Sequence, residues 1–295
     1  MKPTIFTGSA VAIITPMHPD GSVNYKEFDR ILNYQIENGT DAIVVCGTTG
    51  EASTMPDAEH LSVIERAVQT VNHRVPVIAG TGSNDTPHAI SLSRGARDLG
   101  ADALLLVTPY YNKTSQRGLV QHFNTIIDAA GLPAILYSVA SRTGVNIAPA
   151  TVKELAKNPL VCGIKEASGN IAQVAQIAAD CGDEIDLYSG NDDQIVPLLS
   201  LGGKGVISVL ANVAPQKAHD ICQLWFDGKV QESAKLQLAM LPLIHALFCD
   251  VNPMPVKAAM NLLGWNAGSC RMPLIDLDEA QTARVRTELQ KAGLL

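Results

Sequence analysis

Residues 10–45 read AVAIITPMHPDGSVNYKEFDRILNYQIENGTDAIVV. Two short apolar runs, residues 10–14 and 42–45, stand at the ends of this stretch, and a longer interval separates them. Within residues 25–37 the apolar side chains recur with the period of a helix, with acidic and amide residues between them. The stretch therefore predicts a strand, a helix and a second strand. Strands that are apolar at nearly every position are typical of parallel sheets, because helices cover both faces of such sheets.

The same unit recurs along the chain. Six further apolar runs follow, at residues 75–79, 104–107, 134–137, 161–164, 185–188 and 205–209. Successive runs begin roughly 20 to 35 residues apart, which is the length that a strand, a crossover helix and two short loops require. Eight such units in succession favour closure into a (β/α)8 TIM barrel, an α/β fold.

The pattern changes after the eighth predicted strand. Residues 214–295 contain three or four predicted helices and no further strand pattern, and several prolines punctuate them. We therefore expect residues 1–213 to form the barrel core. Residues 214–295 are expected to complete the barrel and to form a C-terminal helical appendage.

A doubly wound dinucleotide-binding sheet is the main alternative fold. Its marker is the motif G-x-G-x-x-G directly after the first strand, but residues 15–21 read TPMHPDG. Gly80 and Gly82 begin such a pattern after the third predicted strand, and Asp85 then occupies the position of the third glycine. The sequence therefore favours the barrel.

Composition limits the possible partners. The chain has 295 residues, of which 46% are hydrophobic and 17% charged, which is enough apolar material for one sizeable core. A formal charge of -7 and no run of Lys and Arg argue against nucleic acid. No window approaches the roughly 18 apolar residues of a membrane helix, and residues 1–16 lack the pattern of a cleaved signal. We expect a cytoplasmic protein.

The cysteines and histidines do not form metal-binding patterns. The six cysteines are scattered without a C-x-x-C pair, so neither a disulfide framework nor a thiolate metal site is expected. The seven histidines show no H-x-H or H-E-x-x-H spacing. We expect no metal ion and no other cofactor.

Polar side chains collect where the predicted strands end. Barrel enzymes place their sites at the C-terminal ends of the strands, so this distribution predicts a site there. The polar strand ends are residues 47–51, residues 108–111, Tyr137, Lys165 with Glu166, and residues 190–192.

Lys165 is the strongest candidate among them, because the run before it, residues 161–164, is apolar. Burial disfavours a charged ammonium and favours the neutral amine, which is the nucleophilic form. The alternative is a structural lysine that reaches the rim of the barrel and pairs with Glu166.

Hydroxyl groups near such an amine can transfer protons, and Tyr137, Thr48 and Tyr111 are the candidates. The alternative for each tyrosine is simple packing with a satisfied hydroxyl. Arg142, in a predicted loop closed by Gly144, can bind a carboxylate through two parallel hydrogen bonds. Its alternative is a surface salt bridge.

Several ordered motifs then resemble one family over nearly the whole chain. These motifs are A-I-V-V-C-G-T-T-G-E at residues 42–51, A-G-T-G at 79–82, T-P-Y-Y-N at 108–112, R-T-G at 142–144, G-I-K-E at 163–166, S-G-N-D at 189–192, G-V-I-S-V at 205–209 and N-P-M-P-V-K at 252–257. The chain resembles the dihydrodipicolinate synthases, also called 4-hydroxy-tetrahydrodipicolinate synthases, of the pyruvate-dependent lyase and aldolase superfamily.

The resemblance implies that Lys165 forms a Schiff base with pyruvate and that Tyr137, Thr48 and Tyr111 relay protons. It further implies four substrate-binding positions, namely Thr49 for the pyruvate carboxylate, Arg142 for the carboxylate of L-aspartate 4-semialdehyde, and Gly190 and Ile207. The product of the condensation leads to diaminopimelate and lysine. In the family Tyr111 enters the neighbouring subunit's site, which implies a homotetramer built as a dimer of dimers.

Two segments depart from the family pattern. Ser138 and Ala140 stand where the family usually has Asn and Pro. Without the proline the unfolded chain has more conformational entropy, which corresponds to roughly 0.4 to 1 kcal/mol. In the lysine-feedback pocket of some members, His88 replaces a Glu and Asp57 replaces a His. The position of His88 thus lacks an anion for the effector's ammonium group, so we expect weak or absent inhibition by lysine.

Three alternatives to the synthase activity remain at this point. N-acetylneuraminate lyases and 2-keto-3-deoxy sugar acid aldolases share the barrel and the lysine but use other aldehydes. The R-T-G motif at residues 142–144 favours the synthase. A non-catalytic ligand-binding barrel is the third alternative, since one fold can host unrelated functions.

Overall fold

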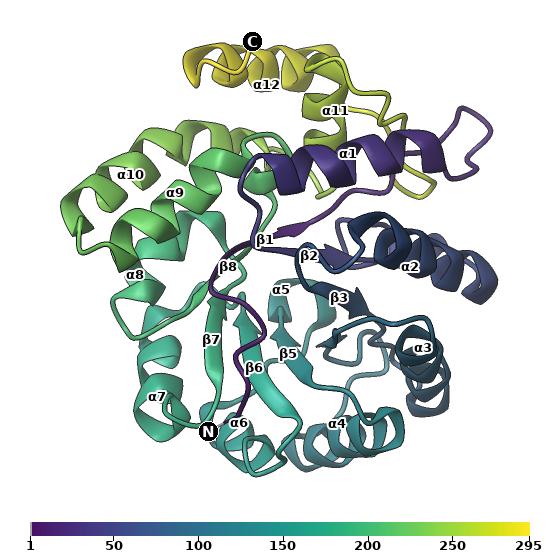
Figure 1. Cartoon of the computed structure of the whole chain (residues 1–295), viewed down its shortest axis with the longest axis vertical. Helices are drawn as coiled ribbons and strands as arrows, with labels where there is room; N and C mark the ends of the chain where they lie inside the picture. The colour runs from purple at the N-terminus through teal and green to yellow at the C-terminus, as the bar shows by residue number, and fades with distance from the viewer. Residues whose placement is uncertain (1) are drawn as a thin grey trace.

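The computed structural model describes residues 2–295, and its centre is a closed barrel of eight parallel strands (Figure 1). Each strand pairs with its neighbours in chain order, and β8 returns to pair with β1. The strands are β1 (Gly8–Ala12), β2 (Ala42–Val45), β3 (Val77–Gly80), β4 (Ala103–Val107), β5 (Ala134–Ser138), β6 (Val161–Glu166), β7 (Asp186–Ser189) and β8 (Gly205–Ser208). The predicted TIM barrel is confirmed.

The helices of the barrel surround the strands. They are α1 (Tyr25–Glu37), α2 (Asp57–Val71), α3 (Thr86–Asp98), α4 (Gln116–Ala130), α5 (Ala140–Thr143), α6 (Pro149–Leu155), α7 (Ile171–Cys181) and α8 (Ile195–Leu199). Short 3-10 turns, η1 (Ala52–Thr54), η2 (Asp192–Gln194) and η3 (Leu210–Asn212), follow β2, β7 and β8. The amphipathic stretch at residues 25–37 is α1 as predicted, with Phe28, Ile31 and Leu32 buried against the barrel.

The first predicted strand was placed two residues too late. Its pairing with β8 begins at Gly8, and the Gly8 N–H donates to the carbonyl of Lys204, just before β8. At the other end, the Ile14 N–H donates to the Asn212 side chain instead of a strand partner. The apolar run continues through Ile14 because this residue is buried, although it has left the sheet.

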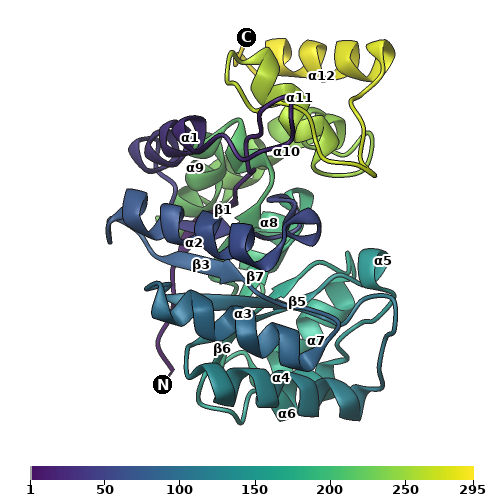
Figure 2. The same cartoon turned by 90° about the vertical axis from the view of Figure 1, so that its right-hand side faces the viewer.

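Four helices follow β8, as the sequence predicted: α9 (Pro215–Phe226), α10 (Val230–Ala246), α11 (Met254–Leu262) and α12 (Glu279–Lys291). No further strand occurs between residues 209 and 295. In both views α11 and α12 lie at the end of the molecule opposite the N-terminus, beyond the ring of helices (Figures 1 and 2). We call residues 250–295 the appendage.

The appendage is fastened to the first half of the barrel. Arg271 forms an ion pair with Glu59 of α2 through two hydrogen bonds of 2.6 and 2.7 Å. The Asn266 N–H donates to the Glu27 carboxylate of α1 at 2.8 Å. Gly268 has φ +68°, and a Cβ there would lie 2.0 Å from the Met17 carbonyl oxygen, so this close approach requires glycine.

The interior of the barrel is closed at the end where the strands begin. Phe6, just before β1, stacks on Tyr188 of β7 with ring centroids 4.3 Å apart. The Tyr188 hydroxyl donates to the Phe6 carbonyl at 2.7 Å, and both side chains are buried. Burial raises the pKa of Tyr188, so this hydroxyl stays protonated. The open end of the barrel is therefore the end where the strands finish.

Among residues 2–295, no helix combines the length and the apolar character that crossing a membrane requires.

Candidate active site

A cavity opens at the C-terminal ends of the strands, where the sequence predicted a site. It is lined by six of the eight predicted site residues, namely Thr48, Thr49, Tyr137, Arg142, Lys165 and Gly190. These residues come from the ends of β2, β5, β6 and β7 and the segments that follow them. The parallel register explains the convergence, because all strands finish at the same end of the barrel.

Lys165 lies inside the barrel. It is a residue of β6, its side chain is 6% exposed, and Tyr137 is its partner in the register of β5. The Lys165 Nζ atom is 4.3 Å from the centroid of the Tyr137 ring. Among residues 2–295 no carboxylate forms an ion pair with it. The amine thus stands in a buried setting without a fixed counter-ion.

Glu166 does not pair with Lys165, because successive side chains of a strand point to opposite faces. Its carboxylate accepts hydrogen bonds from the Ser168 N–H, the Ser168 hydroxyl and Gln173. Burial raises the pKa of Glu166, and these three hydrogen bonds act against that shift. The alternative in which Lys165 is the rim partner of Glu166 is therefore wrong.

Asp192, a polar strand-end residue to which the sequence analysis gave no role, is a buried carboxylate that fixes the chain after β8. It accepts hydrogen bonds from the Ser208 hydroxyl at 2.5 Å and from the Val209 and Leu210 N–H groups at 3.0 and 2.9 Å. Burial raises the pKa of Asp192, while these bonds and the charge of Lys165 lower it. Its place in the S-G-N-D motif was the available signal.

Arg142 belongs to a short helix, not to the predicted loop. α5 is a single turn, and Gly144 ends it in the left-handed conformation with φ +72°. Four residues are too few to show a helical period, which is why the sequence suggested a loop. Arg142 is exposed and has no ion-pair partner among residues 2–295, so the alternative role, a surface salt bridge, is not formed within this chain.

The two substituted residues near α5 are accommodated. Ala140 is the first residue of this turn, a position where proline is also favoured, so the two residues suit the same backbone. Ser138 is buried, and its hydroxyl donates to the Asn146 side chain and accepts from the Ile147 N–H, both at 3.1 Å. The short serine therefore anchors the segment after Gly144.

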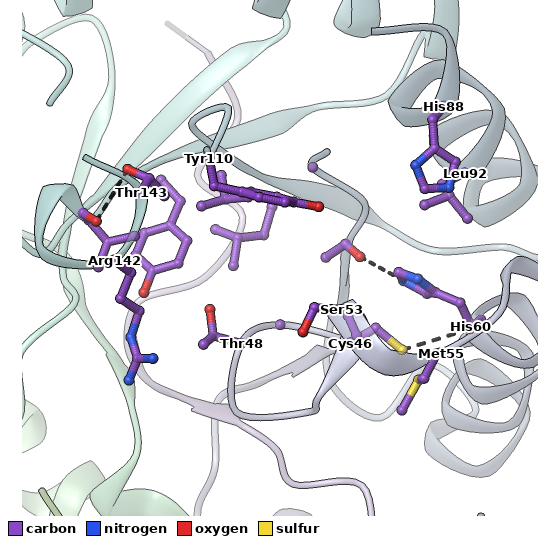
Figure 3. Close-up of a pocket in the computed structure, with 18 of the residues that line it drawn as sticks. Cys46, Thr48, Ser53, Met55, His60, His88, Leu92, Tyr110, Arg142 and Thr143 are labelled. Atoms are coloured by element: carbon purple, nitrogen blue, oxygen red, sulfur yellow. Dashed lines mark hydrogen bonds between the residues drawn. The ribbon is translucent and has the colours of Figure 1, made fainter. Parts of the chain in front are cut away.

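A second cavity shares Thr48, Tyr137 and Arg142 with the first and extends between α2 and α3. Figure 3 shows Arg142 and Thr48 on one side of it and His60 and His88 on the other. His60 contacts the Gly80 carbonyl at 2.9 Å, and burial lowers its pKa. His88 lies 2.9 Å from the Asp57 carboxylate.

Two predicted site residues do not line either cavity. Tyr111 is 92% exposed and has φ +70°, so its side chain projects from the loop after β4 into solvent. Ile207 of β8 is fully buried in the barrel interior, in the same cluster as Tyr137 and Tyr188. Ile207 therefore has no exposed side chain with which to contact a ligand.

Asn252, from the N-P-M-P-V-K motif, is a cavity residue to which the sequence analysis gave no role. It is 5% exposed and lies just before α11, about 200 residues after Thr49, which it contacts. Its Nδ2 atom donates to the Thr49 hydroxyl oxygen at 3.0 Å, and Arg142 donates to its carbonyl at 3.4 Å. The appendage thus contributes to the site.

Within residues 2–295, no group of three or more His, Cys, Asp and Glu side chains is arranged to hold a metal ion.

Comparison with known proteins gives one consistent result. The model of the dihydrodipicolinate synthetase family matches residues 5–292. The 4-hydroxy-tetrahydrodipicolinate synthase of Caldicellulosiruptor bescii is 55% identical over 291 residues, which cover 99% of this chain and 98% of that protein.

Two solved structures are similar in fold and in sequence. The chloride-inhibited dihydrodipicolinate synthase of Acinetobacter baumannii, complexed with pyruvate, has a TM-score of 0.96 at 43% identity and covers 99% of this chain and 100% of that one. The DHDPS of Cyanidioschyzon merolae, with lysine bound, has a TM-score of 0.96 at 38% identity and covers 99% and 100%.

Proposed function

The chain belongs to the dihydrodipicolinate synthetase family, and from this premise we propose how its residues carry out the reaction. It is a Schiff-base-forming carbon–carbon lyase that condenses pyruvate with L-aspartate 4-semialdehyde to give 4-hydroxy-tetrahydrodipicolinate. That product leads to diaminopimelate and lysine. The observation that carries the assignment of roles is Lys165, a buried amine without a carboxylate partner at the open end of the barrel.

Lys165 is the nucleophile in this proposal. Its neutral amine adds to the keto carbon of pyruvate to give a carbinolamine, and loss of one water molecule leaves an imine. Removal of a methyl proton from the imine gives the enamine, whose carbon attacks the aldehyde and forms the new carbon–carbon bond. The amino group of the second substrate then displaces Lys165 and closes the ring.

The proton transfers are assigned to hydroxyl groups. Carbinolamine formation and dehydration each move a proton, and Tyr137 and Thr48 line the cavity that holds Lys165. Tyr111 is the third member of the relay. Because Tyr111 is exposed on this chain, we assign it to the site of a neighbouring subunit in a homotetramer, a dimer of dimers.

Four positions are assigned to substrate binding. Thr49 accepts a hydrogen bond from Asn252, so its own hydroxyl hydrogen is free to donate to the pyruvate carboxylate. Gly190 borders the same space. Ile207 is assigned to substrate binding from the family resemblance alone, because it is fully buried and does not line the cavity. Arg142, which has no carboxylate partner on this chain, receives the carboxylate of the aldehyde through its planar guanidinium.

Reduction with borohydride tests the proposal. Incubation with pyruvate followed by borohydride should convert the imine into a stable secondary amine, and peptide mapping should find the added mass on Lys165. In a separate assay without borohydride, the enzyme should condense pyruvate with aspartate semialdehyde and not with N-acetylmannosamine. An unmodified chain after reduction would contradict the covalent mechanism and favour a ligand-binding barrel.

We further propose that the protein works in the cytoplasm, where a biosynthetic enzyme of this kind finds its substrates.

Inhibition by lysine should be weak or absent. His88 stands where lysine-inhibited members have a Glu, so this position offers no carboxylate to an ammonium group, and the Asp57 carboxylate in the same cavity already lies 2.9 Å from His88. Inhibition at sub-millimolar lysine in a steady-state assay would refute this expectation.

A further inference from the structure

The loop that carries Thr48 and Thr49 has an unusual path. Two of its residues, Cys46 at φ +54° and Glu51 at φ +58°, are non-glycine residues in the left-handed conformation. Such conformations cost of order 1–3 kcal/mol each and persist only where the surroundings hold them. Something must therefore hold the loop at both ends.

The Glu51 end is held by the appendage. The Lys257 ammonium of α11 lies 2.8 Å from one carboxylate oxygen of Glu51, and the Arg271 N–H donates to the other at 2.8 Å. Lys257 also donates to the Ser269 carbonyl at 2.8 Å. Both charged side chains are almost fully buried, so solvent does not screen the pair.

The two residues of this ion pair are close in sequence to Thr49 and Asn252, which line the cavity that holds Lys165. Glu51 is two residues after Thr49, and Lys257 is five residues after Asn252, which donates to the Thr49 hydroxyl. The appendage thus contacts the loop at both residues. Neither charged group lines the cavity that holds Lys165, so neither touches substrate.

We propose that the buried Glu51–Lys257 pair is a positioning device, which fixes the Thr48–Thr49 loop in the geometry that binds the pyruvate carboxylate. This inference rests on the proposed function. A buried ion pair is weak evidence for stability, because desolvation offsets the attraction, but it enforces one relative placement of its two partners. Here the partners are the loop after β2 and the helix α11.

A neutral replacement of the pair tests the proposal. The double variant Glu51→Gln/Lys257→Met removes both charges together, so no buried ion is left unpaired. We expect the pyruvate concentration that gives half-maximal adduct after borohydride reduction to rise roughly tenfold or more, because small displacements of binding groups have large effects. The KM for the aldehyde at saturating pyruvate should rise less.

Glu27→Gln is the matched control. Glu27 is also a buried glutamate that accepts an N–H of the appendage, from Asn266 at 2.8 Å, but it lies on α1, away from the cavity. We expect it to lower the melting temperature and to leave half-saturation by pyruvate unchanged. If the double variant behaves like this control, the pair is only structural and the proposal is overturned.

A second variant and the wild-type protein serve as controls for this test. Should the double variant not fold, Glu51→Gln alone retains the shape of the side chain, and we expect a rise in half-saturation of about threefold. An unchanged value for that folded variant would overturn the proposal. Failure of the proposed function is visible separately, because the wild-type chain would then give no adduct at any pyruvate concentration.

Discussion

Two buried lysines at the same end of the barrel differ in one respect. Lys257 is 1% exposed and Lys165 is 6% exposed, so both have lost most of their hydration. Lys257 has a carboxylate at 2.8 Å and a carbonyl at 2.8 Å, whereas Lys165 faces the ring of Tyr137. The donors of Lys257 are therefore occupied, whereas the Lys165 amine has no carboxylate bound to it among residues 2–295 and is free to meet a ligand. The comparison teaches that the partner of a buried lysine, more than its burial, indicates its role.

The strongest way to break this comparison is Lys165→Met. The substitution removes the amine and keeps a side chain of similar length, so we expect no adduct with pyruvate. Condensation should fall by a factor of about a thousand or more. A steady-state assay and mass spectrometry after borohydride reduction measure both effects. Substantial remaining activity would show that another group is the nucleophile.

Lys257→Met should act on folding. It leaves the Glu51 carboxylate buried without its cation, which costs about 3–5 kcal/mol of the free energy of unfolding. Denaturant melts followed by circular dichroism measure this loss. Lys291→Met, at a lysine 66% exposed in its pair with Glu288, is the control and should change the free energy by less than about 1 kcal/mol. Equal losses of unfolding free energy at the two positions would contradict the idea that burial of the ion pair sets the cost of removing its lysine.

Tyr111→Phe tests whether the relay to Lys165 crosses a subunit boundary. Removing one proton-transfer group should lower the turnover rate by about 10 to 100-fold and leave the melting temperature nearly unchanged, because the hydroxyl is exposed on this chain. A stopped-flow or steady-state assay at saturating substrates gives the rate. An unaltered rate would remove Tyr111 from the mechanism.

The smallest expected effect is that of Lys165→Met on stability. Because Lys165 forms no ion pair and acts only weakly on the hydrogen-bonded Asp192, we expect the free energy of unfolding to stay within about 1 kcal/mol of the wild-type value or to rise. The same denaturant melts used for Lys257→Met provide the measurement. A loss as large as that of Lys257→Met would reveal an essential contact of Lys165 and erase the distinction between the two lysines.

The sequence predicted those features that depend on local pattern. The apolar runs identified all eight strands, and the residues after them gave Thr48, Tyr137 and Lys165, because strand ends in a barrel converge by topology. The resemblance to a family added Thr49 and Gly190, which line the same cavity. Their roles remain predictions.

Contacts between distant segments could not be predicted. Glu51 and Lys257 are 206 residues apart, and no local period or motif links them. The same holds for Asn252, whose motif was visible although its contact with Thr49 was not. The single turn that carries Arg142 was missed for a different reason, since four residues have no measurable period.

The stacked rings of Phe6 and Tyr188 have a consequence for the route by which ligands reach Lys165. The two buried rings fill the end of the barrel where the strands begin, and the cavity lined by Lys165 opens at the opposite end. Under the proposed mechanism, both substrates therefore reach Lys165, and the water released on imine formation leaves, through that open end.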